Sequence, residues 1–485
     1  MKRIILIIFC ILAAFAANAQ GLRVPKFFGD NMVLQQQTDA NIWGWAPAGA
    51  KVKIQVSWSG ARYSVKAGSD GFWKVAVATP AASFTPQTVT ISSGKEKITL
   101  GNLLIGEVWL CGGQSNMEMP LGGWPYQPIE GGAEAMRDSH SLKGLRMAFM
   151  PHVTSEKPEE DIECKWNTTD DGSIASWSAV AYFFGCRLTR ELDVPVGLIV
   201  SCWGGSMLEC WTDRATLRSL GLSDEYIDND IKTYMASAGW HTNTVMYNAM
   251  IHPLRHYTIN GFIWYQGCSN VSRLGIQDYA QYQAGLVKFW RTLFGRGDLP
   301  FYYVQIAPHP YAADEGDSGL APLLRERQRV AASLVPNSAM APTCDLVYEF
   351  EKGIIHPRQK EPVGDRLAYL ALENWYGIKG LGSASPEFVK MEADGAKARI
   401  WLSNATGGLH GDTGWQFSGI DGFEVSGEDG RWHPAIILGS SGDTIEIGCE
   451  EVPEIKNVRY LWHDFAIGRL WNGYGMPIVP FCTSL

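Results

Sequence analysis

The sequence predicts an α/β fold in which a mostly parallel sheet carries helices on both faces and is flanked by β-rich regions. Two observations predict it. In the middle of the chain, apolar runs typical of buried strands alternate with stretches of helical periodicity, whereas both ends contain short strand-like runs separated by turn residues. The length of 485 residues also exceeds one typical domain and favours two or three.

Residues 1–19 have the three parts of a secretory signal peptide. Two basic residues precede an apolar run over 4–17, and a small-residue pattern ending at Ala19 offers a cleavage site. The apolar run is shorter than the ~20 residues that a membrane-spanning helix needs. We therefore expect an exported protein, periplasmic or extracellular, with no membrane span.

The composition is typical of packed globular domains, with 46% hydrophobic and 19% charged residues. The net charge is −9 and no basic run occurs, so the chain lacks the electrostatic pattern of a nucleic-acid-binding protein. One of the 10 cysteines lies in the signal peptide, which leaves an odd number in the mature chain. At least one thiol is therefore unpaired in the monomer, and disulfide pairings cannot be read from the sequence. No Cys or His spacing typical of a zinc site occurs, so we expect no metal.

Residues 20–103 predict an N-terminal β-domain. Short runs rich in Val, Ile, Thr and Trp are separated by Gly, Pro, Ser and Asp, a pattern typical of a sandwich. The runs cover residues 40–46, 50–58, 71–79 and 87–93.

Residues 104–387 predict the α/β domain. Its apolar strand-like runs cover 104–110, 194–205, 259–267 and 299–308, and its helix-like stretches cover 178–192, 277–295, 320–334 and 358–372. Active sites of such sheets lie beyond the carboxyl ends of the strands. Residues 388–485 return to strand-like runs, which predict a second small β-domain or a completion of the first.

The segment "GEVWLCGGQSNMEMP" carries the strongest chemical signal. After the strand, Gly112 and Gly113 permit a tight turn that places Ser115 at the start of a helix, beside unpaired backbone N–H groups. A serine in this place is also typical of a helix N-cap. The residues alone therefore leave both a structural and a catalytic interpretation of Ser115 open.

Four motifs in order resemble the conserved blocks of the SGNH hydrolase superfamily, specifically of the sialate O-acetylesterase family. They are "GGQSN" around Ser115, "GLIVSCWGGSMLECW" at 197–211, "IWYQGCSN" at 263–270 and "IIHPRQKEPVGDRLA" at 354–368. The ending "RLWNGYGMPIVPF" is similar to that family as well, so the resemblance covers nearly the whole mature chain. It implies an SGNH-type three-layer α/β/α catalytic domain.

The resemblance also implies the site residues. Ser115 matches the nucleophile and His356 the catalytic base. The oxyanion hole would consist of the Ser115 N–H, the N–H of Gly205 or alternatively Gly204, and the side chain of Asn270. Such acyl transfer requires no cofactor. Three further residues of the motifs are expected to shape the substrate pocket: Gln114, Glu209 and Gln266.

Two departures from the family pattern bear on the mechanism. Family members place an acid two or three residues before the histidine, where this chain has Ile354 and Gly353. Glu351 is our preferred replacement. Two other carboxylates of the preceding loop, Glu349 and Asp345, or a backbone carbonyl that leaves a Ser–His dyad, are alternatives. The second departure is Cys268, which stands where the family has a glutamate.

The sequence thus predicts an esterase that removes acetyl groups from sugars, with O-acetylated sialic acid as the expected substrate. Acetylxylan or another acetylated polysaccharide is the alternative in the same reaction class. Cys268, the missing acid and the 19 tryptophans motivate a second alternative, a carbohydrate-binding protein with an impaired esterase core. An exported lipase is a third, which a series of acyl-chain lengths would test.

Overall fold

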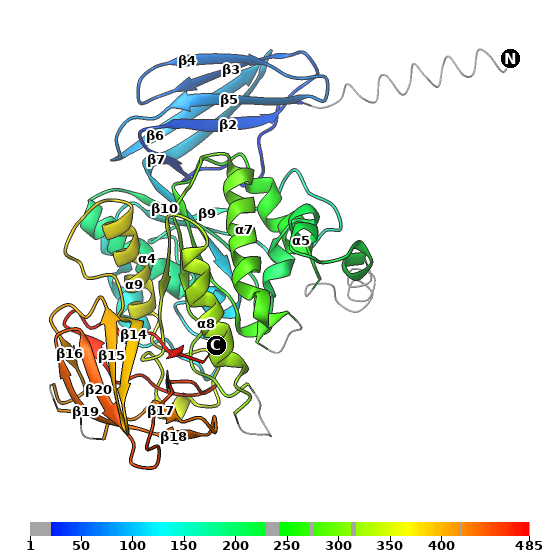
Figure 1. Ribbon diagram of the computed structural model, residues 1–485. Coiled ribbons are helices and arrows are strands. Elements are labelled where there is room, and N and C mark those ends of the chain that lie inside the picture. The colour runs from blue at the N-terminus through cyan, green and yellow to red at the C-terminus, as the bar shows by residue number, and fades with distance from the viewer. Residues whose placement is uncertain are drawn as a thin grey trace.

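The computed structural model describes residues 21–228, 242–271, 275–311, 317–414, 416–417 and 419–484. The predicted signal peptide lies outside these residues. Figure 1 shows a β-rich region at each end of the molecule and a helix-covered sheet between them. Within the described part of the chain, no helix has the length and apolar character needed to cross a membrane.

The N-terminal region is built from short strands, as its turn-separated runs predict. They are β1 (Val33–Gln35), β2 (Asp39–Trp45), β3 (Lys51–Val56), β4 (Arg62–Lys66), β5 (Phe72–Ala78) and β6 (Ser83–Ser93). Strand β2 pairs with β5, whereas β3 lies between β4 and β6. Burial alternates along β3, because every second side chain points to the same face of the sheet.

Strand β7 (Glu96–Gly113) belongs to both the N-terminal region and the central sheet. Its first half pairs with β6, and its second half pairs in parallel with β10 (Val196–Cys202) and β11 (Gly261–Tyr265). The boundary predicted between residues 103 and 104 therefore falls inside one continuous strand. The Ser115 motif follows the end of this strand directly.

The central sheet has the strand order β13-β12-β11-β7-β10-β8-β9. The remaining strands are β8 (Leu145–Phe149), β9 (Trp166–Thr168), β12 (Phe301–Val304) and β13 (Ser338–Ala341). All neighbours along this path are parallel except β8 and β9. The structure therefore confirms a mixed α/β fold with a largely parallel central sheet.

Helices cover both faces of this sheet, as the alternation of strand and helix patterns predicts. The four long helices are α4 (Ala179–Leu192), α7 (Tyr279–Phe294), α8 (Leu320–Ser333) and α9 (Glu361–Asn374). Side chains of α4 and α9 share a buried cluster with Trp109 and Cys111 of β7, whereas α7 and α8 share the other cluster with Val108 and Leu110. Successive residues of β7 thus face opposite helical layers.

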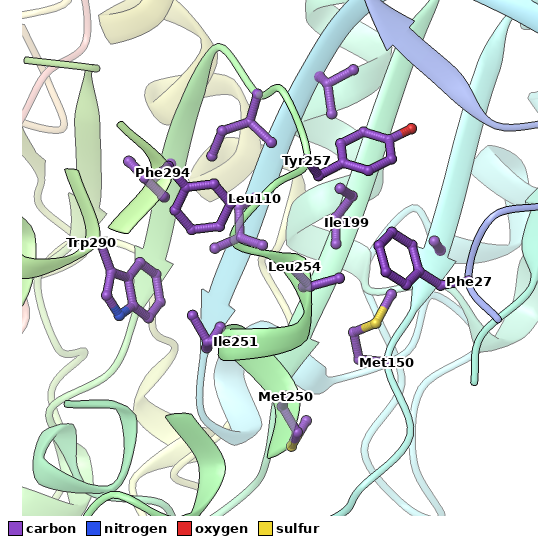
Figure 2. Packing of buried hydrophobic residues seen from close by; sticks show 14 of the residues in the cluster. Phe27, Leu110, Met150, Ile199, Met250, Ile251, Leu254, Tyr257, Trp290 and Phe294 are labelled. Atoms are coloured by element: carbon purple, nitrogen blue, oxygen red, sulfur yellow. The ribbon is translucent and has the colours of Figure 1, made fainter. Parts of the chain in front are cut away.

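Short helices lie mainly in the loops at the ends of the strands. They are α2 (Ser115–Glu118), α3 (Gly132–Asp138), α5 (Arg214–Ser219), η1 (Ser139–Ser141), η2 (Ile174–Ser176), η3 (Leu208–Trp211), η4 (Tyr247–Ile251), η5 (His252–Leu254), η6 (Cys268–Asn270), η7 (Ile276–Asp278) and η8 (Glu349–Glu351). Figure 2 shows side chains of the η4–η5 segment, including Ile251 and Leu254, directed toward Leu110 and Ile199 of the sheet. Each fully buried aliphatic side chain of this kind contributes about 1.5–3 kcal/mol.

The C-terminal region consists of antiparallel sheets with a separate hydrophobic core. One sheet has the order β14-β15-β20-β19 and another the order β18-β17-β21-β23, while β16 pairs with β22. The bounds are β14 (Glu387–Asp394), β15 (Lys397–Ser403), β16 (Leu409–His410), β17 (Phe423–Ser426), β18 (Trp432–Pro434), β19 (Ile436–Ser441), β20 (Thr444–Gly448), β21 (Asn457–Tyr460), β22 (Trp471–Asn472) and β23 (Phe481–Cys482). No disulfide joins the nine cysteines of the described residues.

Candidate active site

The site lies where three neighbouring parallel strands end. Cys202 of β10 and Tyr265 of β11 both pair with Gly113, the last residue of β7. Because these carboxyl ends meet at one edge of the sheet, the loops that follow them lie together. They carry Ser115, the Gly204–Gly205 turn and Asn270, which the sequence places far apart.

Position 113 requires a glycine because strands β7 and β11 approach each other closely there. Its φ is 142°, and a Cβ atom at this position would lie 2.2 Å from the Tyr265 carbonyl oxygen. The next residue, Gln114, donates its backbone N–H to the same carbonyl at 3.0 Å. This tight contact ends β7 and starts α2 at Ser115, whose side chain stays partly exposed.

Ser115 and His356 meet, although 241 positions separate them. His356 Nε2 lies 2.8 Å from Ser115 Oγ, within hydrogen-bonding distance. His356 belongs to the loop between η8 and α9 and is partly buried. The structure thus brings together the two residues on which the predicted chemistry depends, and the contact has the geometry of an activated nucleophile and its base.

The protein environment keeps His356 neutral. Burial, together with the charges of Lys360 and His309, lowers the pKa of the imidazole to about 4. At neutral pH the ring is therefore unprotonated at one nitrogen. A neutral imidazole is the form that can accept the proton of an attacking serine hydroxyl.

Gln127 orients the imidazole ring from its other side. His356 Nδ1 lies 2.9 Å from Gln127 Oε1, so the Nδ1–H donates to the amide oxygen and Nε2 is left to accept from Ser115. The ring of Trp124 packs edge-on against the imidazole, with 4.8 Å between centroids and a 73° interplanar angle. Hydrogen bond and ring contact together fix the orientation of His356.

The structure corrects the prediction that Glu351 orients the histidine. The Glu351 carboxylate is 1% exposed and accepts the backbone N–H groups of Tyr348 and Arg358, both at 3.0 Å. It also pairs with the Arg358 guanidinium at 3.2 Å. These bonds close the loop before His356. Asp345, one of the alternatives, forms a buried ion pair with Arg366.

Asn270 lies in a buried network that fixes its amide. Its Oδ1 accepts hydrogen bonds from the Leu208 N–H at 3.2 Å and from Gln266 Nε2 at 2.6 Å. Its Nδ2 donates to Glu209 Oε2 at 2.9 Å. An amide nitrogen carries two hydrogens, so this arrangement determines which atom is oxygen and leaves one N–H for a further acceptor.

The three residues predicted to shape a pocket are buried and hydrogen-bonded to protein groups, with exposed fractions of 2% for Gln114, 7% for Glu209 and 0% for Gln266. Gln114 Oε1 accepts the Gly267 N–H at 3.0 Å, which ties the loop of Ser115 to the loop of Asn270. Their oxygens and nitrogens thus connect the loops of the site from behind.

The Gly204–Gly205 turn faces the nucleophile. A Cβ atom on Gly204 would lie 3.3 Å from Ser115 Cβ, and the Gly204 N–H donates to Glu118 Oε2 at 2.5 Å. Gly205 has a φ of 76°, which favours glycine. The N–H of Gly204 is thus engaged by a carboxylate. Gly205 stays the preferred candidate for the oxyanion donor.

An aromatic wall stands next to this turn. The rings of His152 and Trp203 stack with 4.4 Å between centroids and 8° between planes. His152 Nε2 also lies 3.3 Å from Glu118 Oε1. The wall combines a flat apolar face with polar atoms, a surface suited to a sugar ring.

Cys268 is buried beneath the site. Its Sγ lies 3.9 Å from Asn116 Nδ2, and burial raises the pKa of the thiol. A neutral thiol therefore occupies the place where the resemblance implies a charged carboxylate. In the described part of the chain, no group of three or more His, Cys, Asp or Glu side chains could hold a metal ion.

Sequence reasoning missed Gln127, Trp124 and the aromatic wall. Gln127 and Trp124 lie in a loop whose glycines and prolines predict only turns, and no motif of the family resemblance includes them. His152 lies in none of the four motifs either. The aromatic content of the chain was the one available signal, and it does not single out particular rings.

Comparisons with known proteins identify the family of the chain. The family described as carbohydrate esterase, sialic acid-specific acetylesterase, matches residues 105–373. Human sialate O-acetylesterase is 31% identical over 77% of this chain and 74% of its own, and the mouse enzyme is 28% identical over 94% and 92%. The crystal structure of a carbohydrate acetylesterase from Xanthomonas citri superimposes with a TM-score of 0.84 and 30% identity, covering 95% of this chain and 99% of that one. The chain therefore belongs to the carbohydrate esterase family of sialic acid-specific acetylesterases.

Proposed function

We propose that this carbohydrate O-acetylesterase cleaves acetyl esters of sugar hydroxyls by a Ser–His mechanism with a covalent acetyl-enzyme. The observation that carries the mechanism is the 2.8 Å contact between Ser115 Oγ and His356 Nε2. In the same site Gln127 holds the other ring nitrogen, so a side-chain amide stands where a triad would have an acid.

In the first half-reaction Ser115 Oγ attacks the acetyl carbonyl carbon while its proton passes to His356 Nε2. The Ser115 N–H, the Gly205 N–H and the remaining Asn270 Nδ2 hydrogen stabilise the oxyanion of the tetrahedral intermediate. As the intermediate collapses, the C–O bond to the sugar breaks and the imidazolium returns the proton to the leaving oxygen. The Nδ1–H of His356 donates to Gln127 Oε1 throughout the reaction.

In the second half-reaction water attacks the acetyl-serine. His356 Nε2 accepts a proton from that water, and the same donors stabilise the second oxyanion. Collapse releases acetic acid, which ionises to acetate in water, and returns the proton from His356 Nε2 to Ser115 Oγ. Each proton transferred within the site thus passes through Nε2.

The finer class of the fold is part of this proposal. We propose an SGNH-type three-layer catalytic domain, supported by the layers of α4–α9 and α7–α8 on the two faces of the sheet and by the positions of the four motifs at strand ends. We also propose that residues 1–19 direct export. Sequencing the amino terminus of the chain recovered outside the cytoplasm tests the cleavage site.

For the sugar we propose O-acetylated sialic acid, which is supported by the family description and by the names of the mammalian relatives. A neutral acetylated polysaccharide is the second candidate. The Glu118 carboxylate at the Gly204 turn favours it, because an anionic side chain beside Ser115 repels the carboxylate of a sialic acid. Arg358, two residues after His356, is paired with Glu351.

The experiment measures acetate released from O-acetylated sialosides and from acetylated xylan by wild type, Ser115→Ala and the matched control Ser333→Ala, an exposed serine of α8. We expect the wild type and the control to be equally active and Ser115→Ala to be inactive. Release from one substrate class alone assigns the sugar. If wild type and Ser115→Ala were equally inactive on acetyl esters while sugars still bound, the carbohydrate-binding alternative would replace this proposal.

A further inference from the structure

The Lys360 side chain is an amine buried next to the catalytic pair. It lies four residues after His356, is 1% exposed, and precedes helix α9. Among the residues that the structure describes, no carboxylate forms an ion pair with its amine. Burial without a counter-ion strongly disfavours a charged group, so this position needs an explanation other than stability.

The amine connects the two halves of the site through one side chain. Lys360 Nζ donates to Asn116 Oδ1 at 2.5 Å, and Asn116 Nδ2 donates to the Ile355 carbonyl at 3.0 Å. Asn116 follows Ser115 and is 0% exposed, whereas Ile355 precedes His356. The amide of Asn116 thus joins the backbone beside the nucleophile to the backbone beside the base.

The orientation of the Asn116 amide depends on Lys360. A lysine ammonium is a donor only, so it binds the oxygen of the amide and directs the nitrogen toward the Ile355 carbonyl. If the amide were turned, its NH₂ group would face the ammonium and its oxygen would face a carbonyl. Lys360 therefore selects the one orientation that holds the two loops together.

We propose that Lys360 is a positioning residue of the esterase, which sets the approach of His356 to Ser115 through Asn116 and places a positive charge next to the catalytic imidazole. The inference rests on the Ser–His mechanism proposed above. It adds a residue that touches neither substrate nor the reacting atoms and that none of the four motif roles includes.

The surrounding charges determine how Lys360 affects the pH dependence of catalysis. Burial lowers the pKa of Lys360 to about 7, while Cys268 and Glu351 oppose that effect. The amine also lies 5.7 Å from the centroid of the Tyr265 ring. On the other side, His356 faces Lys360 and His309, and both disfavour its imidazolium form. Below pH 6 the amine is protonated, so removing it raises the pKa of His356.

Two substitutions separate the hydrogen bonds from the charge. Asn116→Ala removes the connection and leaves the ammonium, whereas Lys360→Met removes both. We expect each to lower kcat by about 100-fold through misplacement of the catalytic pair. The low-pH decline of kcat/KM moves to higher pH, by about one pH unit, in Lys360→Met alone. Lys352→Met, an exposed lysine of the same loop, is the control and stays like wild type.

The measurement is hydrolysis of p-nitrophenyl acetate between pH 4 and 9, with thermal unfolding of each variant as a check on folding. A double variant tests the connection: if Lys360 acts through Asn116, the double loses no more kcat than Lys360→Met alone. Fluorophosphonate labelling of Ser115 reports nucleophile activation separately from turnover.

Additive losses in the double variant, or a low-pH decline of Lys360→Met that coincides with wild type, would overturn the inference. Should Lys360→Met fail to fold, Lys360→Gln undergoes the same measurements, and a decline at the wild-type pH refutes the inference in that variant too. Activity that survives in Ser115→Ala would instead refute the proposed function, so the two failures are distinguishable.

Discussion

Replacement of Gln127 tests how the site orients its base without an acid. In wild type the His356 Nδ1–H donates to Gln127 Oε1 over 2.9 Å. When Ser115 transfers its proton, the ring becomes an imidazolium, and the bond becomes one from a charged donor. Such bonds contribute about 1.5–3 kcal/mol. Removing the acceptor in Gln127→Ala therefore lowers kcat by roughly 10–100-fold.

The charged variant Gln127→Glu probes the same contact in the opposite direction. A carboxylate facing Nδ1 favours the imidazolium, so it raises the pKa of His356 from about 4 toward its ordinary value. The rate at neutral pH is retained, and the low-pH decline of kcat/KM moves to higher pH. In Gln127→Ala the low-pH decline of kcat/KM does not move to higher pH.

The assay is the pH dependence of kcat and kcat/KM with p-nitrophenyl acetate for wild type and both variants. Gln277→Ala, an exposed glutamine of η7, is the matched control. Two results together would refute the assignment of Gln127 as the orienting residue: a kcat of Gln127→Ala within twofold of wild type, and a pH profile of Gln127→Glu that overlays the wild-type profile.

Four further outcomes are expected. Asn270→Ala removes an oxyanion donor and lowers kcat by about 10²–10³-fold at nearly unchanged KM, and a loss confined to KM would contradict that role. Trp203→Ala raises KM for acetylated sugars and leaves p-nitrophenyl acetate unaffected; equal effects on both substrates would exclude a sugar platform. The pKa of His356 is lowered to about 4 in the native protein, whereas a histidine in an unfolded chain has its ordinary pKa of ~6.5. Between pH 6.5 and 4 the unfolded chain therefore binds a proton that the native protein does not. The melting temperature therefore falls as pH is lowered from 6.5 to 4, and it falls less in His356→Gln. Gly112→Ala places a Cβ 2.8 Å from the Trp264 ring, which costs about 1–3 kcal/mol in chemical denaturation, and an unchanged midpoint would show that the rings yield.

The elements of the chain follow from local sequence patterns. The run over 178–192 has apolar residues at helical spacing and forms α4 from Ala179 to Leu192, with Ser178 accepting the Ala181 N–H as N-cap. The apolar run through Phe262 and Trp264 forms β11, buried on both faces as a strand of a parallel sheet is. Such patterns predict secondary structure because the periodicity of a helix or strand depends only on residues that are close together in the chain.

The sequence by itself predicted Ser115 as nucleophile and His356 as base, because each lies in a motif whose neighbouring residues resemble those of the family. Tertiary structure alone decided their partners. Gln127 reaches His356 across 229 positions and Lys360 reaches Asn116 across 244. Side-chain hydrogen bonds between distant loops follow from how the strand ends are arranged in space, which no local period encodes.

The prediction for Glu351 shows the same division. Proximity in sequence favoured an acid from the loop before His356, yet that carboxylate is turned to backbone N–H groups of its own loop, which would otherwise be buried without partners. The place beside Nδ1 was left to an amide from the loop after α2. The sequence thus predicted the type of reaction and the reacting side chains. The residue that orients the histidine depends instead on which loops the folded sheet brings together.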